Sequence, residues 1–214
     1  MKRTVYCISG LGADEKVFAN LRVDGYELIH IPWLRPHKNE TLVTYAKRMA
    51  ASFRHETPVL LGVSFGGMLG IEIARQLPLQ KLIIVSSIKS VTELPPWMKV
   101  VGKMQLNKFL PVRSYKFTEK VDNNRLGVSN EEEKKMVQAY RKTADSVYIN
   151  WAINKVVNWK NNWQPDNLIH IHGDQDKMFP IKRIKATHII KGGTHLMIYN
   201  RAKEIGEYLE KVLV

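Results

Sequence analysis

The sequence of 214 residues has a single cysteine, no long apolar run and a shortage of acidic side chains. A lone cysteine, Cys7, excludes a disulfide framework within the chain and suits a reducing compartment, where it would be a small core residue of the first strand. No stretch approaches the roughly 18 apolar residues that a membrane-spanning helix needs. The apolar run after Met1 is also too short for a secretory signal. We therefore expect a cytoplasmic protein without stable membrane insertion.

The shortage of acidic residues leaves a net charge of +13, from 33 Lys and Arg against 20 Asp and Glu. Residues 89–160 alone hold 14 of the basic and 7 of the acidic residues. Such a segment can form a basic surface that attracts anionic substrates, lipids or nucleic acid, or simply solvated helical faces. Because no stretch interleaves aromatic and basic residues as a single-strand binding platform does, we expect no nucleic-acid partner.

What the sequence does contain is an alternation of apolar strand-like runs with helical patterns. From Thr41 to Phe53, apolar residues recur at the i, i+3, i+4 spacing of an amphipathic helix. Alternation of this kind predicts an α/β fold in one domain, with a mostly parallel sheet of about six strands flanked by helices. The expected strands are residues 3–9, 26–31, 59–61, 81–86, 167–172 and 185–190.

The alternation stops between residues 88 and 165, where the pattern is helical. We predict that residues 1–87 and 166–214 form the core, and that 88–165 form a helical cap inserted after the fourth strand. A capping box at 129–132 predicts the start of one longer helix with inward-facing side chains. Those side chains are Met136, Val137, Tyr140, Ala144 and Val147.

The predicted cap is rich in large aromatic side chains. It holds four of the five tryptophans, namely Trp97, Trp151, Trp159 and Trp163. Taken singly, each tryptophan is best explained as a packing residue between the cap and the core. Taken together, they favour an apolar pocket under the cap.

The segment from Gly62 to Gly66 reads Gly-Val-Ser-Phe-Gly, between an apolar strand and a helical pattern. This G-x-S-x-G spacing is typical of a nucleophile elbow, in which Ser64 lies on a sharp turn from strand to helix. Glycines are needed on both sides because a Cβ atom there would collide as the chain reverses. The helix N-terminus also directs free N–H groups at an anion. The simpler alternative is a Gly/Ser-rich turn of an α/β protein.

Two interpretations compete for Gly10-Leu11-Gly12 after the first strand. A dinucleotide fingerprint would need a third glycine where the sequence has Glu15. The other interpretation is a loop whose backbone N–H, that of Leu11, binds an oxyanion. We favour the second because the elbow supplies a nucleophile next to which such a loop would act.

A serine hydroxyl becomes nucleophilic when a histidine takes its proton and a carboxylate orients that histidine. The chain offers Ser64, then Asp174 or Asp176, then His195, each just after a predicted strand. Parallel sheets build their sites at these carboxyl ends. The order Ser, Asp, His is the one expected of an elbow-type hydrolase.

Over essentially its whole length the chain resembles the α/β-hydrolase superfamily. The resemblance is carried by residues 9–12, the elbow at 62–67, His-Gly-Asp-Gln-Asp-Lys-Met-Phe-Pro at 172–180 and the histidine segment at 192–200. It departs from many members in having Ser9, where they have histidine, before Gly10. That departure raises the question of how the loop is anchored.

The resemblance implies roles for individual residues. The superfamily pattern H-G-x-x-D-x-x-x-P makes Asp176 the catalytic acid, with Ser64 as nucleophile and His195 as base. Asp174 would then be a turn residue that accepts nearby backbone N–H groups. The N–H of Phe65 would join that of Leu11 in the oxyanion hole.

We therefore predict a serine hydrolase that cleaves a carboxylic ester or thioester of a small-molecule acyl substrate through an acyl-enzyme. The basic cap favours an anionic substrate such as a carrier-linked thioester. We expect no cofactor and no metal, because His170 and His172 alternate on one strand without a third ligand. One alternative is a non-hydrolytic ligand-binding or signalling protein on the same scaffold. Another, a nucleic-acid-associated protein, rests on charge alone.

Overall fold

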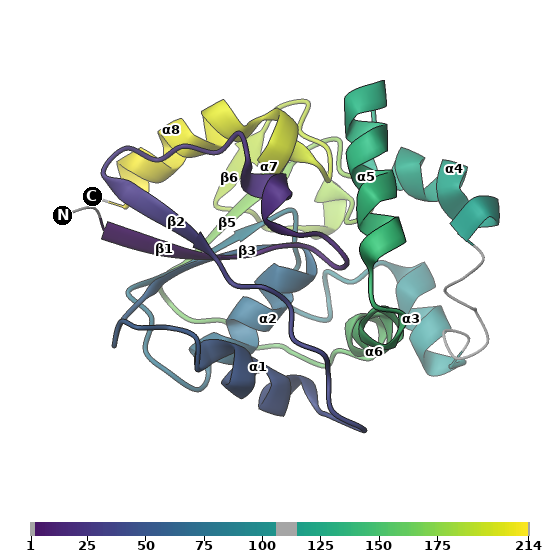
Figure 1. Cartoon of the computed structure of the whole chain (residues 1–214), viewed down its shortest axis with the longest axis horizontal. Coiled ribbons are helices and arrows are strands. Elements are labelled where there is room, and N and C mark those ends of the chain that lie inside the picture. Colours follow the sequence, from purple (N-terminus) through teal and green to yellow (C-terminus); the bar gives the residue numbers. More distant parts are fainter. Residues whose placement is uncertain (1–2, 106–114, 214) are drawn as a thin grey trace.

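The computed structural model describes residues 3–105 and 115–213. Its strands are β1 (Arg3–Ile8), β2 (Tyr26–His30), β3 (Val59–Val63), β4 (Lys81–Val85), β5 (Leu168–Gly173) and β6 (His188–Ile190). They form one sheet in the order β2-β1-β3-β4-β5-β6, and every neighbouring pair is parallel (Figure 1). The predicted α/β fold with a six-stranded parallel sheet is therefore confirmed.

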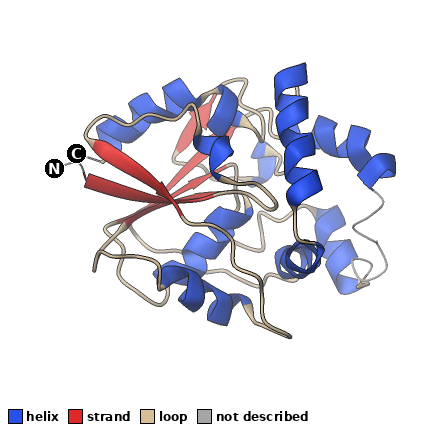
Figure 2. Cartoon of the chain, in the orientation of Figure 1, coloured by secondary structure: helices blue, strands red, loops and turns tan. Residues whose placement is uncertain are grey.

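Helices cover both faces of the sheet (Figure 2). Helices α1 (Leu42–Ala50) and α2 (Phe65–Ala74) lie on one face, and α7 (Met197–Asn200) and α8 (Ala202–Val212) on the other (Figure 1). Two separate apolar clusters fill the two interfaces. Because both faces are covered, all five residues of β3 are buried, as expected of a central parallel strand. Cys7, predicted to be a core residue, is buried in β1.

Four helices lie between β4 and β5 in the sequence, beyond the carboxyl ends of the strands (Figure 1). They are α3 (Pro96–Lys103), α4 (Tyr115–Leu126), α5 (Glu131–Thr143) and α6 (Ser146–Val157). The single longer helix that we predicted is wrong: the chain leaves the helix after Thr143, and Asp145 caps a new one by accepting the Val147 N–H. Val147 consequently faces solvent, with 44% of its surface exposed.

The start of α5 is also shifted by one residue from the predicted capping box. Asn130, not Ser129, is the N-cap, and its side chain accepts the Glu133 N–H. The Glu133 carboxylate in turn accepts the Ser129 N–H at 2.7 Å. The arrangement differs from a capping box in that the return bond goes to the N–H of Ser129, which precedes the N-cap, rather than to the N–H of Asn130 itself.

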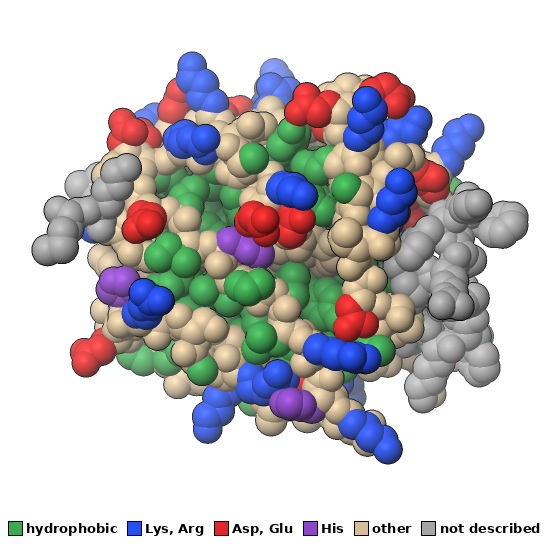
Figure 3. All heavy atoms as spheres, viewed as in Figure 1, with side chains coloured by type: hydrophobic (Ala, Val, Ile, Leu, Met, Phe, Trp, Pro, Cys, Tyr) green, Lys and Arg blue, Asp and Glu red, His purple; other side chains and the backbone are tan. Residues whose placement is uncertain are grey.

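The surface shows no single basic region on the face in view. Figure 3 shows Lys and Arg side chains interspersed with Asp and Glu across that face. This distribution agrees with charged helical faces in solvent. Within residues 3–105 and 115–213, no helix has the length and apolar character to cross a membrane.

Candidate active site

Ser64 lies on the turn from β3 to α2 with a strained backbone, at φ 53° and ψ −117°. A residue other than glycine rarely adopts a positive φ, and such strain is concentrated at functional sites. The neighbouring glycines make the turn possible. A Cβ atom on Gly62 would lie 2.3 Å from the Gly66 carbonyl oxygen, and one on Gly66 would lie 2.4 Å from the Ile8 oxygen. Backbone therefore passes where any side chain would be.

The structure brings Ser64, Asp176 and His195 together at the carboxyl ends of β3, β5 and β6. His195 Nε2 lies 3.0 Å from Ser64 Oγ, and His195 Nδ1 lies 2.8 Å from Asp176 Oδ2. A carboxylate can only accept, so Nδ1 carries the proton and Nε2 is left to accept from the serine hydroxyl. Asp176 and His195 are both buried, with 3% and 6% of their surfaces exposed.

The two aspartates of the acid loop have different partners. Asp176 uses its second oxygen, Oδ1, to accept the N–H groups of Met178 and Phe179, each at 2.8 Å. Asp174 accepts the Gly192 N–H at 2.7 Å and so joins the acid loop to the segment that carries His195. Asp174 is predicted to be a turn residue that accepts nearby backbone N–H groups. The acceptance of a backbone N–H agrees, but the donor lies 18 residues along the chain rather than in the same turn.

The two other histidines of β5 are completely buried. His172 Nε2 bonds the Phe179 carbonyl at 2.8 Å and lies 3.6 Å from Asp176 Oδ2. Burial lowers the pKa of His172, so the imidazole is neutral and donates to that carbonyl. Among the described residues, no group of three or more His, Cys, Asp or Glu is placed to hold a metal ion. The expected absence of a metal stays a prediction.

The loop after β1 lies against the elbow, since a Cβ atom on Gly10 would be 3.5 Å from the Cβ of Ser64. Ser9 anchors this loop: its hydroxyl donates to the Ala13 carbonyl at 2.7 Å and accepts the Trp33 indole N–H at 3.0 Å. This answers how the loop is held without the histidine found in many superfamily members. The backbone N–H groups of Leu11 and Phe65 have no acceptor among the residues that the structure describes.

Aromatic side chains surround the elbow. The ring of Trp33 stacks on Phe65 with centroids 5.3 Å apart, and it lies 5.1 Å from Tyr148 of α6. Trp151, also on α6, lies 6.1 Å from Phe65. We did not predict Trp33 or Tyr148 as site residues. Trp33 follows β2, which ends at the same edge of the sheet as β1 and β3, and this position was a usable signal. Nothing in the sequence distinguishes Tyr148.

The remaining tryptophans of the predicted cap have packing or surface roles. Trp97 and Trp163 are 40% and 38% exposed, and each ring is covered by an arginine guanidinium. Trp159 is buried, and its indole N–H donates to Glu72 at 2.7 Å. Of the four, Trp151 is therefore the one with a ring contact to Phe65.

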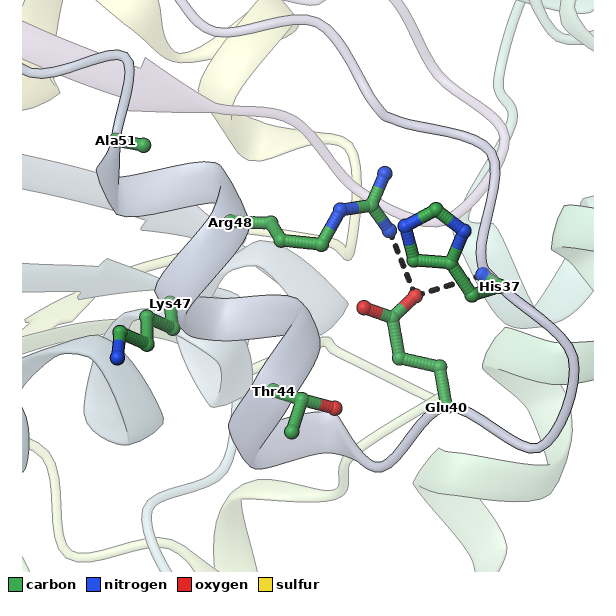
Figure 4. Close-up of a pocket in the computed structure, with 6 residues that line it drawn as sticks. All are labelled: His37, Glu40, Thr44, Lys47, Arg48 and Ala51. Carbon is green, nitrogen blue, oxygen red and sulfur yellow. Dashed lines mark hydrogen bonds and ion pairs between the residues drawn. The ribbon is translucent and has the colours of Figure 1, made fainter.

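A surface hollow of about 610 Å³ lies beside α1 (Figure 4). Its lining residues are His37, Glu40, Thr44, Lys47, Arg48 and Ala51. The Glu40 carboxylate in it is paired with Arg48 at 2.8 Å and also accepts the His37 N–H. None of the predicted site residues lines this hollow.

Solved structures with a similar fold exist, although no family model matches the chain and no curated protein matches it in sequence. A thermophilic esterase from Thermogutta terrifontis has a TM-score of 0.78 at 18% identity, over 100% of this chain and 92% of the esterase. A hydrolase from Pseudomonas aeruginosa has a TM-score of 0.76 at 12% identity, over 99% and 90%. A mutant of the N-acyl homoserine lactonase AidH, complexed with N-hexanoyl homoserine, has a TM-score of 0.68 at 17% identity, over 99% and 88%.

Proposed function

This chain has the α/β-hydrolase fold, and on that premise we propose that it is a serine hydrolase that cleaves a carboxylic ester or thioester. The observation that carries the proposal is the chain of contacts from Ser64 Oγ to His195 Nε2 at 3.0 Å and from His195 Nδ1 to Asp176 at 2.8 Å. Together with the strained backbone of Ser64, this arrangement has the parts needed for nucleophilic catalysis.

In the proposed acylation step, Ser64 Oγ attacks the substrate carbonyl carbon while His195 Nε2 takes the hydroxyl proton. Asp176 holds the imidazole in its tautomer and stabilises the imidazolium. The carbonyl oxygen becomes an oxyanion, which accepts the N–H groups of Leu11 and Phe65. Each such donor contributes about 3 kcal/mol to stabilisation of the transition state.

Collapse of the tetrahedral intermediate breaks the bond to the alcohol or thiol, which leaves with the proton from His195. The acyl group remains on Ser64. Water then attacks the carbonyl carbon of that acyl group while His195 takes a proton from the water. His195 passes this proton to Ser64 Oγ as the carboxylic acid leaves, which restores the free serine. The cycle balances with no co-reactant other than water, so the proposal invokes no cofactor.

The substrate is proposed to be a small acyl ester. The structural neighbours include an esterase and a lactonase, whose names describe cleavage of acyl–oxygen bonds. The rings of Trp33 and Trp151 pack around the buried Phe65, the residue after Ser64, so the vicinity of the serine is apolar, which suits an acyl group. A thioester remains within the proposal because the same acyl chemistry serves both leaving groups.

A fluorophosphonate probe tests this function, since it phosphonylates an activated serine. We expect labelling of the wild type and hydrolysis of p-nitrophenyl acetate, with both lost in Ser64→Ala. Ser52→Ala, which removes the hydroxyl of an exposed serine, is the matched control and should keep both. Absence of labelling and of hydrolysis in the folded wild type would refute the proposal and favour a ligand-binding protein on this scaffold.

A further inference from the structure

Tyr148 of α6 has a buried hydroxyl without a hydrogen-bond partner among the described residues, although only 5% of its surface is exposed. A buried donor left unpaired costs about 1 to 3 kcal/mol, so native proteins retain few of them. Phenylalanine would fill the same space without that cost. The hydroxyl is therefore free to donate to an acceptor that binds from outside the protein, and its position decides which acceptor that can be.

The position of Tyr148 indicates where that acceptor would lie. Its ring is 5.1 Å from Trp33, whose indole N–H also points at the Gly10 carbonyl at 3.2 Å. The next residue along α6, Ile149, has its Cδ1 only 3.1 Å from where a Cβ atom on Gly12 would be. Helix α6 thus lies directly against the Gly10–Gly12 loop, which includes Leu11.

The hydroxyl is available as a donor at any physiological pH. Burial, and to a smaller extent the neighbouring Tyr45, raises the pKa of Tyr148 well above its usual value. The Gly12 backbone amide offsets part of that rise in pKa, although no hydrogen bond of normal geometry joins it to the phenol oxygen. An N–H of that kind could only donate to the oxygen, so the phenol proton itself still lacks an acceptor.

We propose that Tyr148 donates a hydrogen bond to the carbonyl oxygen of the bound acyl substrate, as a third oxyanion donor beside Leu11 and Phe65. The inference rests on the proposed hydrolase function. It assigns to α6 a direct part in catalysis, because the bond strengthens as negative charge develops on that oxygen. Loss of one such donor lowers kcat by about 10²-fold or more in enzymes of this type.

The test compares Tyr148→Phe with the wild type in hydrolysis of p-nitrophenyl acetate and in inhibition by a trifluoromethyl ketone. The ketone forms a hemiketal with Ser64 that places an oxyanion where the transition state has one. We expect kcat to fall by about 10²-fold and the inhibition constant to rise by a similar factor, with KM nearly unchanged. The melting temperature should stay the same or rise, because the lost hydroxyl is unpartnered in the free protein.

Tyr140→Phe is the matched control. Tyr140 lies on α5, is 8% exposed and also has an unpartnered hydroxyl. Its electrostatic neighbours are Asp14, Glu15 and Tyr199 rather than groups of the elbow, so its loss should leave kcat and the inhibition constant unchanged. The inference is overturned if Tyr148→Phe keeps the wild-type kcat and inhibition constant, or if Tyr140→Phe lowers kcat equally. In either case fluorophosphonate labelling of the wild type would leave the hydrolase proposal standing. A wild type that is not labelled would refute both.

Discussion

Acid should destabilise this protein through His170, a residue of the central sheet. The imidazole is completely buried, and its Nε2 bonds the Ser87 carbonyl at 3.1 Å while Nδ1 has no partner among the described residues. Burial, with smaller contributions from the neighbouring His172 and Lys89, lowers the pKa of His170 to about 3. The folded protein therefore holds this histidine neutral over a range of pH in which the unfolded chain binds a proton.

The sign and size of the effect follow from that difference in pKa. An exposed histidine has a pKa of about 6.5, so between about pH 6.5 and pH 3 the unfolded state binds one more proton than the folded state. The contribution of His170 to the free energy of unfolding is fully present above that window. It is lost as the pH falls through the window, by about 1.4 kcal/mol per pH unit. From pH 7.5 to pH 4.5 the loss from His170 alone is about 2.7 kcal/mol.

Urea denaturation at a series of pH values measures this loss when the wild type is compared with His170→Gln, whose amide can still donate to the Ser87 carbonyl. The variant is expected to be less stable at pH 7.5, and the gap should shrink by about 2.7 kcal/mol on going to pH 4.5. The other titrating groups are the same in both proteins, so their contributions to the pH dependence cancel in the comparison. One of them is Glu93, whose raised pKa makes its contribution to stability increase as the pH falls. Parallel curves for the two proteins would show that this reasoning is wrong.

Two further predictions concern the acid loop and the elbow. Asp176→Asn should lower kcat for ester hydrolysis by about 10⁴-fold by disturbing the imidazole tautomer, whereas Asp174→Asn, whose oxygen can still accept the Gly192 N–H, should change it little. Gly66→Ala should reduce the free energy of unfolding by about 3 kcal/mol or more, because its Cβ would meet the Ile8 carbonyl. Gly25 has a positive φ but open space around it, so Gly25→Ala should reduce the free energy of unfolding by only about 1 to 2 kcal/mol.

Kinetics and denaturation of these four variants can contradict each statement separately. Equal losses of kcat in the two aspartate variants would mean that the choice of Asp176 over Asp174 is wrong. A Gly66→Ala protein as stable as Gly25→Ala would mean that the elbow can move away from β1. The first outcome tests the proposed mechanism, and the second tests the close packing of the elbow against β1.

Much of the fold could be predicted because its signals are local. Strand β3 is an apolar run bounded by Pro58 and the elbow, and buried parallel strands require such runs. The prediction of one continuous helix across α5 and α6 failed for an equally local reason. Ala144 continues the helical spacing, yet Asp145 prefers to cap a new helix, and spacing alone does not distinguish the two outcomes.

The sequence by itself determined which residue types follow which strand: a serine between glycines after β3, aspartates after β5 and a histidine after β6. Only the tertiary structure decided that Ser64, Asp176 and His195 lie within hydrogen-bond distance of one another. It also decided that Trp33 and Tyr148, rather than Trp97 or Trp163, lie beside Phe65 and the Gly10–Gly12 loop. The reason is physical: spacing along the chain fixes the direction of a side chain within its own strand or helix, whereas distances between elements depend on how all of them pack together.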